Sequence, residues 1–166
     1  IFDGRIVHLQ VHDVVLPNGE MSKREIIRHV GAVAAVVTDD ANRVLLVRQF
    51  RLPTGGITWE IPAGTLEPNE PVETCGIREV QEETGYKPLE MIALGGIHPA
   101  PGYPTEYIHI FWARRFVEER LPMGVDEFVE AEWKPLAEAV QMIDDGEITD
   151  SKTVVGILRV ARELKI

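Results

Sequence analysis

Short segments rich in apolar residues dominate the first fifty positions, and their patterns predict β-strands. Residues 5–15 partly alternate between apolar and polar side chains, and residues 24–30 can pair with them across a turn at 16–20 that contains Pro, Asn and Gly. Residues 31–38 and 43–51 contain apolar runs of the kind found in buried strands. The chain is therefore expected to begin with a small antiparallel sheet, followed by two core strands.

A helix of about 14 residues is predicted between Pro71 and Gly85, because proline favours the first turn of a helix and glycine its C-terminal end. For the last of the later helices, Asp150 or Ser151 is the expected N-cap. The same criteria predict the remaining elements: strands at 89–95, 107–116 and 130–134, and helices at 136–145 and 150–164.

The composition is that of a soluble globular domain. The chain has 166 residues, of which 45% are hydrophobic and 27% charged. A single cysteine excludes an intrachain disulfide framework and favours a reducing, cytoplasmic setting. The longest purely apolar stretch, 32–37, is too short to span a membrane, and the N-terminal segment lacks the basic and apolar regions of a signal peptide. No association with a membrane is expected.

Acidic residues outnumber basic ones, and the excess is concentrated in one segment. The formal net charge is −10, and residues 60–90 contain eight acidic and only two basic side chains. An acidic balance disfavours binding to the phosphate backbone of nucleic acids, which requires clustered Lys and Arg. An acidic segment is otherwise typical of a solvated helix face, so the spacing of its carboxylates has to distinguish the two interpretations.

Three carboxylates share one face of the predicted helix. At about 100° per residue, Glu79, Glu82 and Glu83 lie within an arc of about 100°. They are expected to repel one another, because no Lys or Arg is expected on the same stripe at i±4. Oxygen ligands in this arrangement suit a hard divalent cation such as Mg²⁺, shared with substrate phosphates. The opposite side of the helix, which can face the core, carries Ile77, Val80 and Thr84.

The residues around these carboxylates form a longer motif. Gly64 is followed after five residues by Glu70, and after seven more by Arg78-Glu79-Val80-Gln81-Glu82-Glu83-Thr84-Gly85-Tyr86. This run of 23 residues resembles the Nudix box at every specified position. The resemblance implies an α/β class and the Nudix fold, an α/β/α sandwich with a mixed sheet. It also implies a metal-bound loop-helix-loop that hydrolyses nucleoside diphosphates linked to another moiety.

The resemblance assigns roles to the matched positions. It implies that Glu79, Glu82 and Glu83 bind metal, that the Ala63 carbonyl adds a ligand, and that Arg78 orients a glutamate rather than touching substrate. It also implies two or three Mg²⁺ ions per site, or Mn²⁺ or another divalent cation in their place. Three further residues are expected to be structural: Glu70 as a buttress for Arg78, Gly64 for its backbone freedom, and Cys75 as a small buried side chain.

Segments outside the box resemble the ADP-ribose pyrophosphatase branch of the family. They are the lead-in 47–53, the segment 59–64 and Pro101, which follows Gly85 by 16 positions. The similarity spans about residues 24–158 and implies hydrolysis of ADP-ribose to AMP and ribose 5-phosphate. Four residues are carried over as substrate contacts: Arg51 and Arg28 for phosphate or ribose, Glu60 near the metals or ribose, and Gly102 in the loop of Pro101.

Two questions are left open by the sequence. The resemblance implies that Glu127 is the general base or a ligand of a third metal ion, with Glu130 as the alternative. The resemblance also implies a homodimer in which a β-hairpin arm, residues 1–29, reaches from one Nudix hydrolase domain, residues 30–166, to the partner's site. Strands that complete their own domain's sheet would explain the arm equally well.

The substrate assignment has two alternatives. Some members of the branch stack adenine on aromatic side chains from the N-terminal segment, but residues 1–49 contain only Phe2. GDP-mannose or another nucleoside diphosphate sugar is therefore the alternative substrate. A Nudix domain kept as a non-catalytic ligand-binding regulator is the alternative from a different class, marked by loss of a metal carboxylate; none of the three is lost here.

Overall fold

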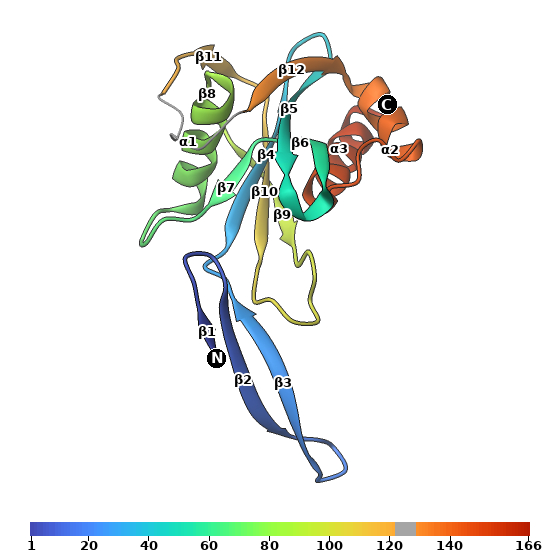
Figure 1. Cartoon of the computed structure of the whole chain (residues 1–166). Coiled ribbons are helices and arrows are strands. Elements are labelled where there is room, and N and C mark those ends of the chain that lie inside the picture. The colour runs from blue at the N-terminus through green and yellow to red at the C-terminus, as the bar shows by residue number, and fades with distance from the viewer. Residues whose placement is uncertain (122–128) are drawn as a thin grey trace.

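A central mixed sheet with helices on both faces forms the body of the protein, and a three-stranded arm extends from it (Figure 1). The computed structural model describes residues 1–121 and 129–166. The arm contains β1 (Phe2–Asp3), β2 (His8–Val15) and β3 (Met21–Arg28). The central sheet contains β4 (Ala32–Thr38), β5 (Arg43–Arg51), β6 (Gly56–Glu60), β7 (Ala63–Thr65), β9 (Ile92–Ile97), β10 (Ile108–Ala113) and β12 (Glu130–Pro135). The other elements are β8 (Tyr86–Pro88), β11 (Phe116–Glu118), α1 (Val72–Thr84), α2 (Leu136–Asp144), α3 (Ser151–Leu164) and a 3₁₀ turn (Leu52–Thr54).

The order of strands makes β4 the centre of the sheet. The path is β12-β5-β4-β10-β9, with β6 added beside β5 and β7 beside β4. Strands β4 and β10 are parallel, whereas the other pairs are antiparallel. Every residue of β4 is buried, because helices cover both faces of the sheet at this strand. A strand covered on both faces reads as an apolar run rather than an alternation, as the sequence of residues 31–38 does.

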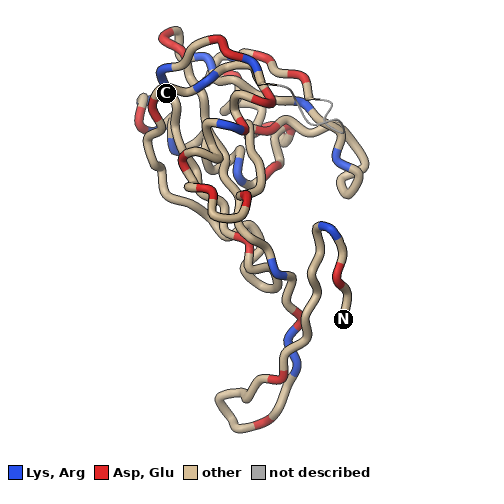
Figure 2. The backbone as a smooth tube through the Cα atoms, turned by 90° about the vertical axis from the view of Figure 1, so that its left-hand side faces the viewer, with Lys and Arg blue, Asp and Glu red and all other residues tan. Residues whose placement is uncertain are grey.

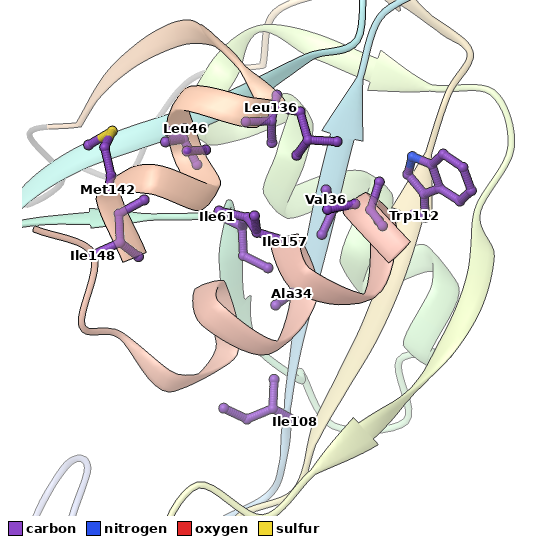
Figure 3. Packing of buried hydrophobic residues seen from close by; sticks show 14 of the residues in the cluster. Ala34, Val36, Leu46, Ile61, Ile108, Trp112, Leu136, Met142, Ile148 and Ile157 are labelled. Atoms are coloured by element: carbon purple, nitrogen blue, oxygen red, sulfur yellow. The ribbon is translucent and has the colours of Figure 1, made fainter. Parts of the chain in front are cut away.

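Alternate residues of β4 belong to two separate cores. Ala34 and Val36 pack with α2 and α3, in the cluster drawn in Figure 3. Val33 and Ala35 pack on the opposite face, with Cys75 and other residues of α1. The layers are therefore α1, sheet, and α2 with α3, and the predicted α/β/α sandwich with a mixed sheet is confirmed.

The helices begin and end close to the predicted residues, because their end signals are local. Helix α1 follows Pro71 and ends at Gly85, whose φ of 79° lies in the left-handed region that favours glycine. The Gly85 N–H donates to the Gln81 carbonyl at 3.0 Å. At α3, Asp150 is the N-cap and its carboxylate accepts from the Thr153 N–H at 3.0 Å.

Strands β6 and β7 were not predicted. Both are short and rich in Gly, Ala or Thr, and Pro62 separates them, so no local alternation marks them. Pairing defines them instead: β6 folds back on the preceding strand β5, with Glu60 opposite Val47, whereas β7 pairs with the more distant β4, with Ala63 opposite Ala34. These two strands carry site residues to the start of the loop before α1.

The predicted N-terminal hairpin is present as β2 and β3, with β1 added to its edge. Figures 1 and 2 show this arm projecting from the body rather than joining the central sheet. It is tied to the loop after β9 by two backbone hydrogen bonds of 2.9 Å, from Ile27 N–H to the Tyr103 carbonyl and from Thr105 N–H to the Ile27 carbonyl. None of the helices in the described residues is long and apolar enough to span a membrane.

Candidate active site

Arg78 connects the carboxylates of α1. Its Nη1 donates to Glu79 Oε1 at 2.7 Å and to Glu82 Oε2 at 3.0 Å. Its Nε and Nη2 donate to the two oxygens of Glu70 at 2.9 and 3.0 Å. Glu70 also accepts from the Glu67 N–H, so this carboxylate is fixed to the loop before the helix. Arg78 therefore stands between a buttress, Glu70, and two candidate metal ligands, as the resemblance implied.

One expectation about this helix is wrong. The carboxylate stripe was expected to lack a basic neighbour at i±4, but Arg78 forms an i,i+4 ion pair with Glu82. Its guanidinium has five N–H donors on a long side chain, so it can bridge from its own position to the stripe. The Arg78 cation therefore offsets part of the repulsion among the three glutamates in the structure.

Glu79 and Glu83 of α1 lie against the backbone of strand β7. The Ala63 N–H donates to Glu83 Oε2 at 3.2 Å. At Gly64, a Cβ atom would lie 1.9 Å from Glu79 Cδ, which means that the Glu79 carboxylate occupies the space a side chain would fill. Gly64 is thus required for close approach rather than for an unusual backbone angle. The Ala63 backbone and the carboxylates of Glu79 and Glu83 lie together.

The donor set suits a hard divalent cation. The groups gathered along α1 and β7 are carboxylates and backbone, which are oxygen ligands of the kind Mg²⁺ prefers. In residues 1–121 and 129–166, no three His, Cys, Asp or Glu side chains form a preassembled metal cluster. Because Gly64 has no side chain, the Glu79 carboxylate can lie against the β7 backbone, close to Ala63 and Glu83. These oxygen-bearing groups fit the Mg²⁺ ions that the family resemblance implies.

Glu60 is the centre of a second charged group. Its side chain is only 3% exposed, and it accepts two hydrogen bonds from Arg51, at 2.7 and 2.8 Å. Thr58 Oγ1 donates to the same carboxylate at 2.6 Å and Lys152 Nζ at 2.5 Å. Glu60 is therefore held by four hydrogen bonds, two of them from Arg51.

The electrostatics of this group follow from burial and pairing. Burial by itself raises the pKa of Glu60, but the hydrogen bonds from Arg51 and Lys152 outweigh it and lower that pKa to about 2. The Glu60 hydrogen bond also raises the pKa of Arg51, and the charges of Glu83 and Asp150 add to this effect. Glu60 and Ala63, which contact Arg51 and Glu83 respectively, are three positions apart in the chain.

Cys75 has the predicted structural role. It is buried under α1, and its Sγ lies 3.5 Å from Arg78 Nη2. Burial first, and then the neighbouring Glu70 carboxylate, raise the pKa of the thiol to about 12. Cys75 therefore stays protonated and acts as a small packing residue.

The other predicted site residues lie elsewhere. Arg28 ends β3 of the arm, where its Nε donates to Gln10 at 3.1 Å, and Gly102 lies in the loop that is bonded to the arm. Glu130 lies opposite Arg48 in the β5–β12 register, which places it on the sheet face of α2 and α3, away from α1. Glu127 lies outside the described residues.

Lys152, Asp150 and Thr58 were not predicted as site residues, although all three belong to the Glu60 group. In the sequence, residues 150–153 indicate only the start of a helix, with Asp150 or Ser151 as its N-cap. A lysine in the first turn of a helix, where the macrodipole disfavours a cation, was the signal that an anionic partner is present.

The NUDIX domain family matches residues 28–154 of this sequence, so the chain belongs to that family. The Gly64–Tyr86 box, the sandwich fold and the position of α1 are therefore those of a Nudix hydrolase. A solved structure described as an ADP compounds hydrolase has a TM-score of 0.90 to this one at 23% identity, covering 99% of this chain and 90% of that one. This likeness shows the fold.

Three characterised relatives are similar over most of the chain. The ADP-ribose pyrophosphatase of Bacillus subtilis is 40% identical over 95% of this chain and 86% of its own length. The methanol dehydrogenase activator of Bacillus methanolicus is 43% identical over the same shares of the two chains. The GDP-mannose pyrophosphatase of Salmonella paratyphi B is 38% identical over 87% of this chain and 81% of its own length. The resemblance to the ADP-ribose pyrophosphatase branch is confirmed.

Proposed function

We propose that this protein hydrolyses the pyrophosphate bond of ADP-ribose to AMP and ribose 5-phosphate in the presence of Mg²⁺. The observation that carries the proposal is that two charged groups are attached to consecutive strands: the α1 carboxylate of Glu83 is bonded to Ala63 of β7, and Arg51 is bonded to Glu60 of β6. Carboxylates bind the cations that a diphosphate needs, and a guanidinium binds its remaining oxygens. The names of the relatives support ADP-ribose as the substrate.

The roles of the residues follow from this arrangement. Glu79, Glu82, Glu83 and the Ala63 carbonyl would hold divalent cations, two or three per site, while Arg78 keeps two of these glutamates in place. When bound, the cations neutralise the diphosphate and lower the pKa of the attacking water. Arg51, with Arg28 and Gly102 as further contacts, binds the substrate, and Glu60 keeps the Arg51 guanidinium oriented. In this proposal Glu127 positions or deprotonates the water.

A nucleoside diphosphate sugar such as GDP-mannose is the second candidate substrate. The N-terminal 49 residues contain only one aromatic side chain, Phe2, so stacking on adenine has little support. A GDP-mannose pyrophosphatase is also among the relatives. The test is to compare kcat/KM for ADP-ribose, GDP-mannose, ADP-glucose, FAD and NADH with Mg²⁺. Preference for ADP-ribose, with AMP and ribose 5-phosphate as products, supports the proposal, and preference for another compound overturns it.

A regulator without turnover is the candidate from another class, and a relative named as an activator keeps it open. All three glutamates of the metal stripe are present in this chain, together with their Arg78 and Glu70 supports. This complete set favours catalysis. The absence of turnover on every compound of the panel, with ligand still bound, would favour the regulator instead.

We further propose that residues 1–29 form a dimerisation arm, that residues 30–166 form the hydrolase domain, and that the protein is a cytoplasmic homodimer. The arm lies apart from the body, and apolar side chains on it face solvent: Val15 is 68% exposed and Met21 66% exposed. Contact with a second copy would remove this apolar surface from water. The single, buried cysteine supports the reducing compartment.

A further inference from the structure

Lys152 lies outside the Nudix box, in the first turn of α3, but its ammonium group points into the site. Its Nζ lies 2.5 Å from Glu60 Oε2 and 3.0 Å from Asp150 Oδ2. Glu60 belongs to β6, so this contact joins two residues that are 92 positions apart. Only 11% of the Lys152 side chain is exposed. A buried ammonium group costs free energy unless anions pair with it, and here two carboxylates do so.

The donors of Glu60 are divided evenly between its two oxygens. Oε1 accepts from Arg51 Nε and Thr58, and Oε2 accepts from Arg51 Nη2 and Lys152. Lys152 therefore shares the negative charge of Glu60 with Arg51. Without the ammonium group, Arg51 would be the only cation bonded to the buried Glu60 carboxylate, and Glu60 Oε2 would lose one of its two donors.

Exposure increases along the group toward Arg51. The Glu60 and Lys152 side chains are almost covered, whereas the Arg51 side chain is 43% exposed. Of these three residues, Arg51 is the one that can contact a ligand. Arg51 Nε and Nη2 both donate to Glu60, one to each carboxylate oxygen. This bidentate contact fixes the plane of the guanidinium, so a shift of the Glu60 carboxylate would also shift the guanidinium.

We propose that Lys152 is a positioning residue for Arg51: it holds the Glu60 carboxylate and shares its charge, so that the Arg51 guanidinium stays oriented toward a diphosphate. The identity of the ligand rests on the proposed function, whereas the Lys152–Glu60–Arg51 relay does not. Lys152 itself does not touch substrate.

A purely structural role for Lys152 is the competing explanation. The start of α3 has a second tie to the sheet, because Thr153 Oγ1 donates to Asp150 at 2.6 Å and accepts from the Ile61 N–H at 2.8 Å. This tie does not involve the ammonium group. Loss of the Lys152 charge is therefore expected to disturb Arg51 more than it disturbs the attachment of α3.

The test compares Lys152→Met with Lys152→Arg in a double-mutant cycle with Arg51→Met. We expect Lys152→Met to lower kcat/KM for ADP-ribose by about ten- to a hundredfold, mainly through KM, and Lys152→Arg to restore most of it. We expect the double variant to lose no more than Arg51→Met alone, because both changes act through one guanidinium. Additive losses, or an unchanged kcat/KM in Lys152→Met, would overturn the proposal.

Lys134→Met is the matched control. Lys134 of β12 is also largely covered and also pairs with two carboxylates, Glu132 and Glu138. Its Nζ lies 4.9 Å from the centre of the Trp59 ring, but it is not one of the four donors to Glu60. We expect the kcat/KM of Lys134→Met to stay within about twofold of that of the parent. Any decrease in kcat/KM should be additive with the decrease caused by Arg51→Met. If Lys152→Met does not fold, Lys152→Gln removes the charge and keeps a donor, and the same outcomes apply.

A measurement without substrate separates this proposal from the proposed function. The Nε–H signal of Arg51 in ¹⁵N NMR spectra reports whether the guanidinium is held by Glu60. We expect a protected signal in the parent and in Lys152→Arg, and loss or broadening in Lys152→Met. An unchanged signal in Lys152→Met overturns the proposed role of Lys152. If the signal changes as expected but the parent does not hydrolyse ADP-ribose, only the substrate assignment is overturned.

Discussion

Gly64 shows how a single residue without a side chain determines a site. The Glu79 carboxylate occupies the position of the missing Cβ, at contact distances of 1.9 to 2.2 Å. A methyl group there would displace the end of a flexible side chain rather than a packed backbone. The glycine therefore matters for where a candidate metal ligand lies, and much less for stability.

We predict that Gly64→Ala separates activity from stability. Because Glu79 must move, the variant should need a higher Mg²⁺ concentration for half-maximal activity and lose about tenfold or more in kcat. Its urea midpoint should stay close to that of the parent. Gly56→Ala is the control, since a Cβ there meets nothing within 4 Å. Parent-like metal dependence in Gly64→Ala would show that Glu79 is not a ligand.

The remaining carboxylates of the stripe give a second prediction at this scale. Glu82→Gln and Glu83→Gln keep the size of the side chain and remove its charge, so each should lower hydrolysis of ADP-ribose with Mg²⁺ by about a hundredfold or more. Circular dichroism should confirm that both variants fold. If either folded variant hydrolyses ADP-ribose as fast as the parent, the metal assignment for that residue is wrong.

At the scale of elements, the tie between β6 and α3 joins the two halves of the site. Glu60 is the last residue of β6, which pairs with β5, and Lys152 lies in the first turn of α3. The Glu60 carboxylate is charged in the folded protein because Arg51 and Lys152 donate to it. The stability that this tie provides therefore depends on pH.

We predict a loss of this stability in acid. The pKa of Glu60 is about 2 in the folded protein, below its ordinary value of 4.5, so its contribution is complete above about pH 4.5 and declines as the pH falls toward 2. Urea unfolding of the parent and of Glu60→Gln should therefore show a large difference in unfolding free energy at pH 7 and a smaller one near pH 3. An equal difference at both pH values would contradict the assignment.

The whole molecule consists of a packed body and an exposed arm. The body buries both faces of β4, whereas the arm leaves apolar side chains such as Val15 and Met21 in solvent. Ile27 connects the arm to the loop that contains Gly102, because its N–H donates to the Tyr103 carbonyl and its carbonyl accepts from the Thr105 N–H. A partner that covers the arm would therefore also act on the loop that is expected to contact substrate.

We predict that the arm holds two copies together. The parent should sediment as a dimer, and Val15→Glu combined with Met21→Glu should shift it toward the monomer, because charges replace apolar surface at the contact. The helical signal of the body should be unchanged. A parent that is a fully active monomer in sedimentation or light scattering would end the dimer proposal.

Much of the fold could be predicted from local signals. Helix α1 was bounded by Pro71 and Gly85, and the buried strands β4 and β5 were recognised from their apolar runs. Strands β6 and β7 were missed because both are short and lack a clear alternation, and because β7 pairs with a strand, β4, that lies about 30 positions earlier. The prediction that the carboxylate stripe lacks a basic neighbour at i±4 was wrong because Arg78 precedes Glu82 by four positions, a spacing that places the two side chains side by side on the helix.

The sequence alone determined the family and the metal-binding face, since Glu79, Glu82 and Glu83 share a helix whose geometry follows from their spacing. Only the tertiary structure decided what each residue touches. It showed that Glu60 holds Arg51, and it brought Lys152 to the same carboxylate from 92 positions away. The physical reason is that helical spacing is a local property of the backbone, whereas contacts between β6 and α3 arise only when the sheet and helices pack together.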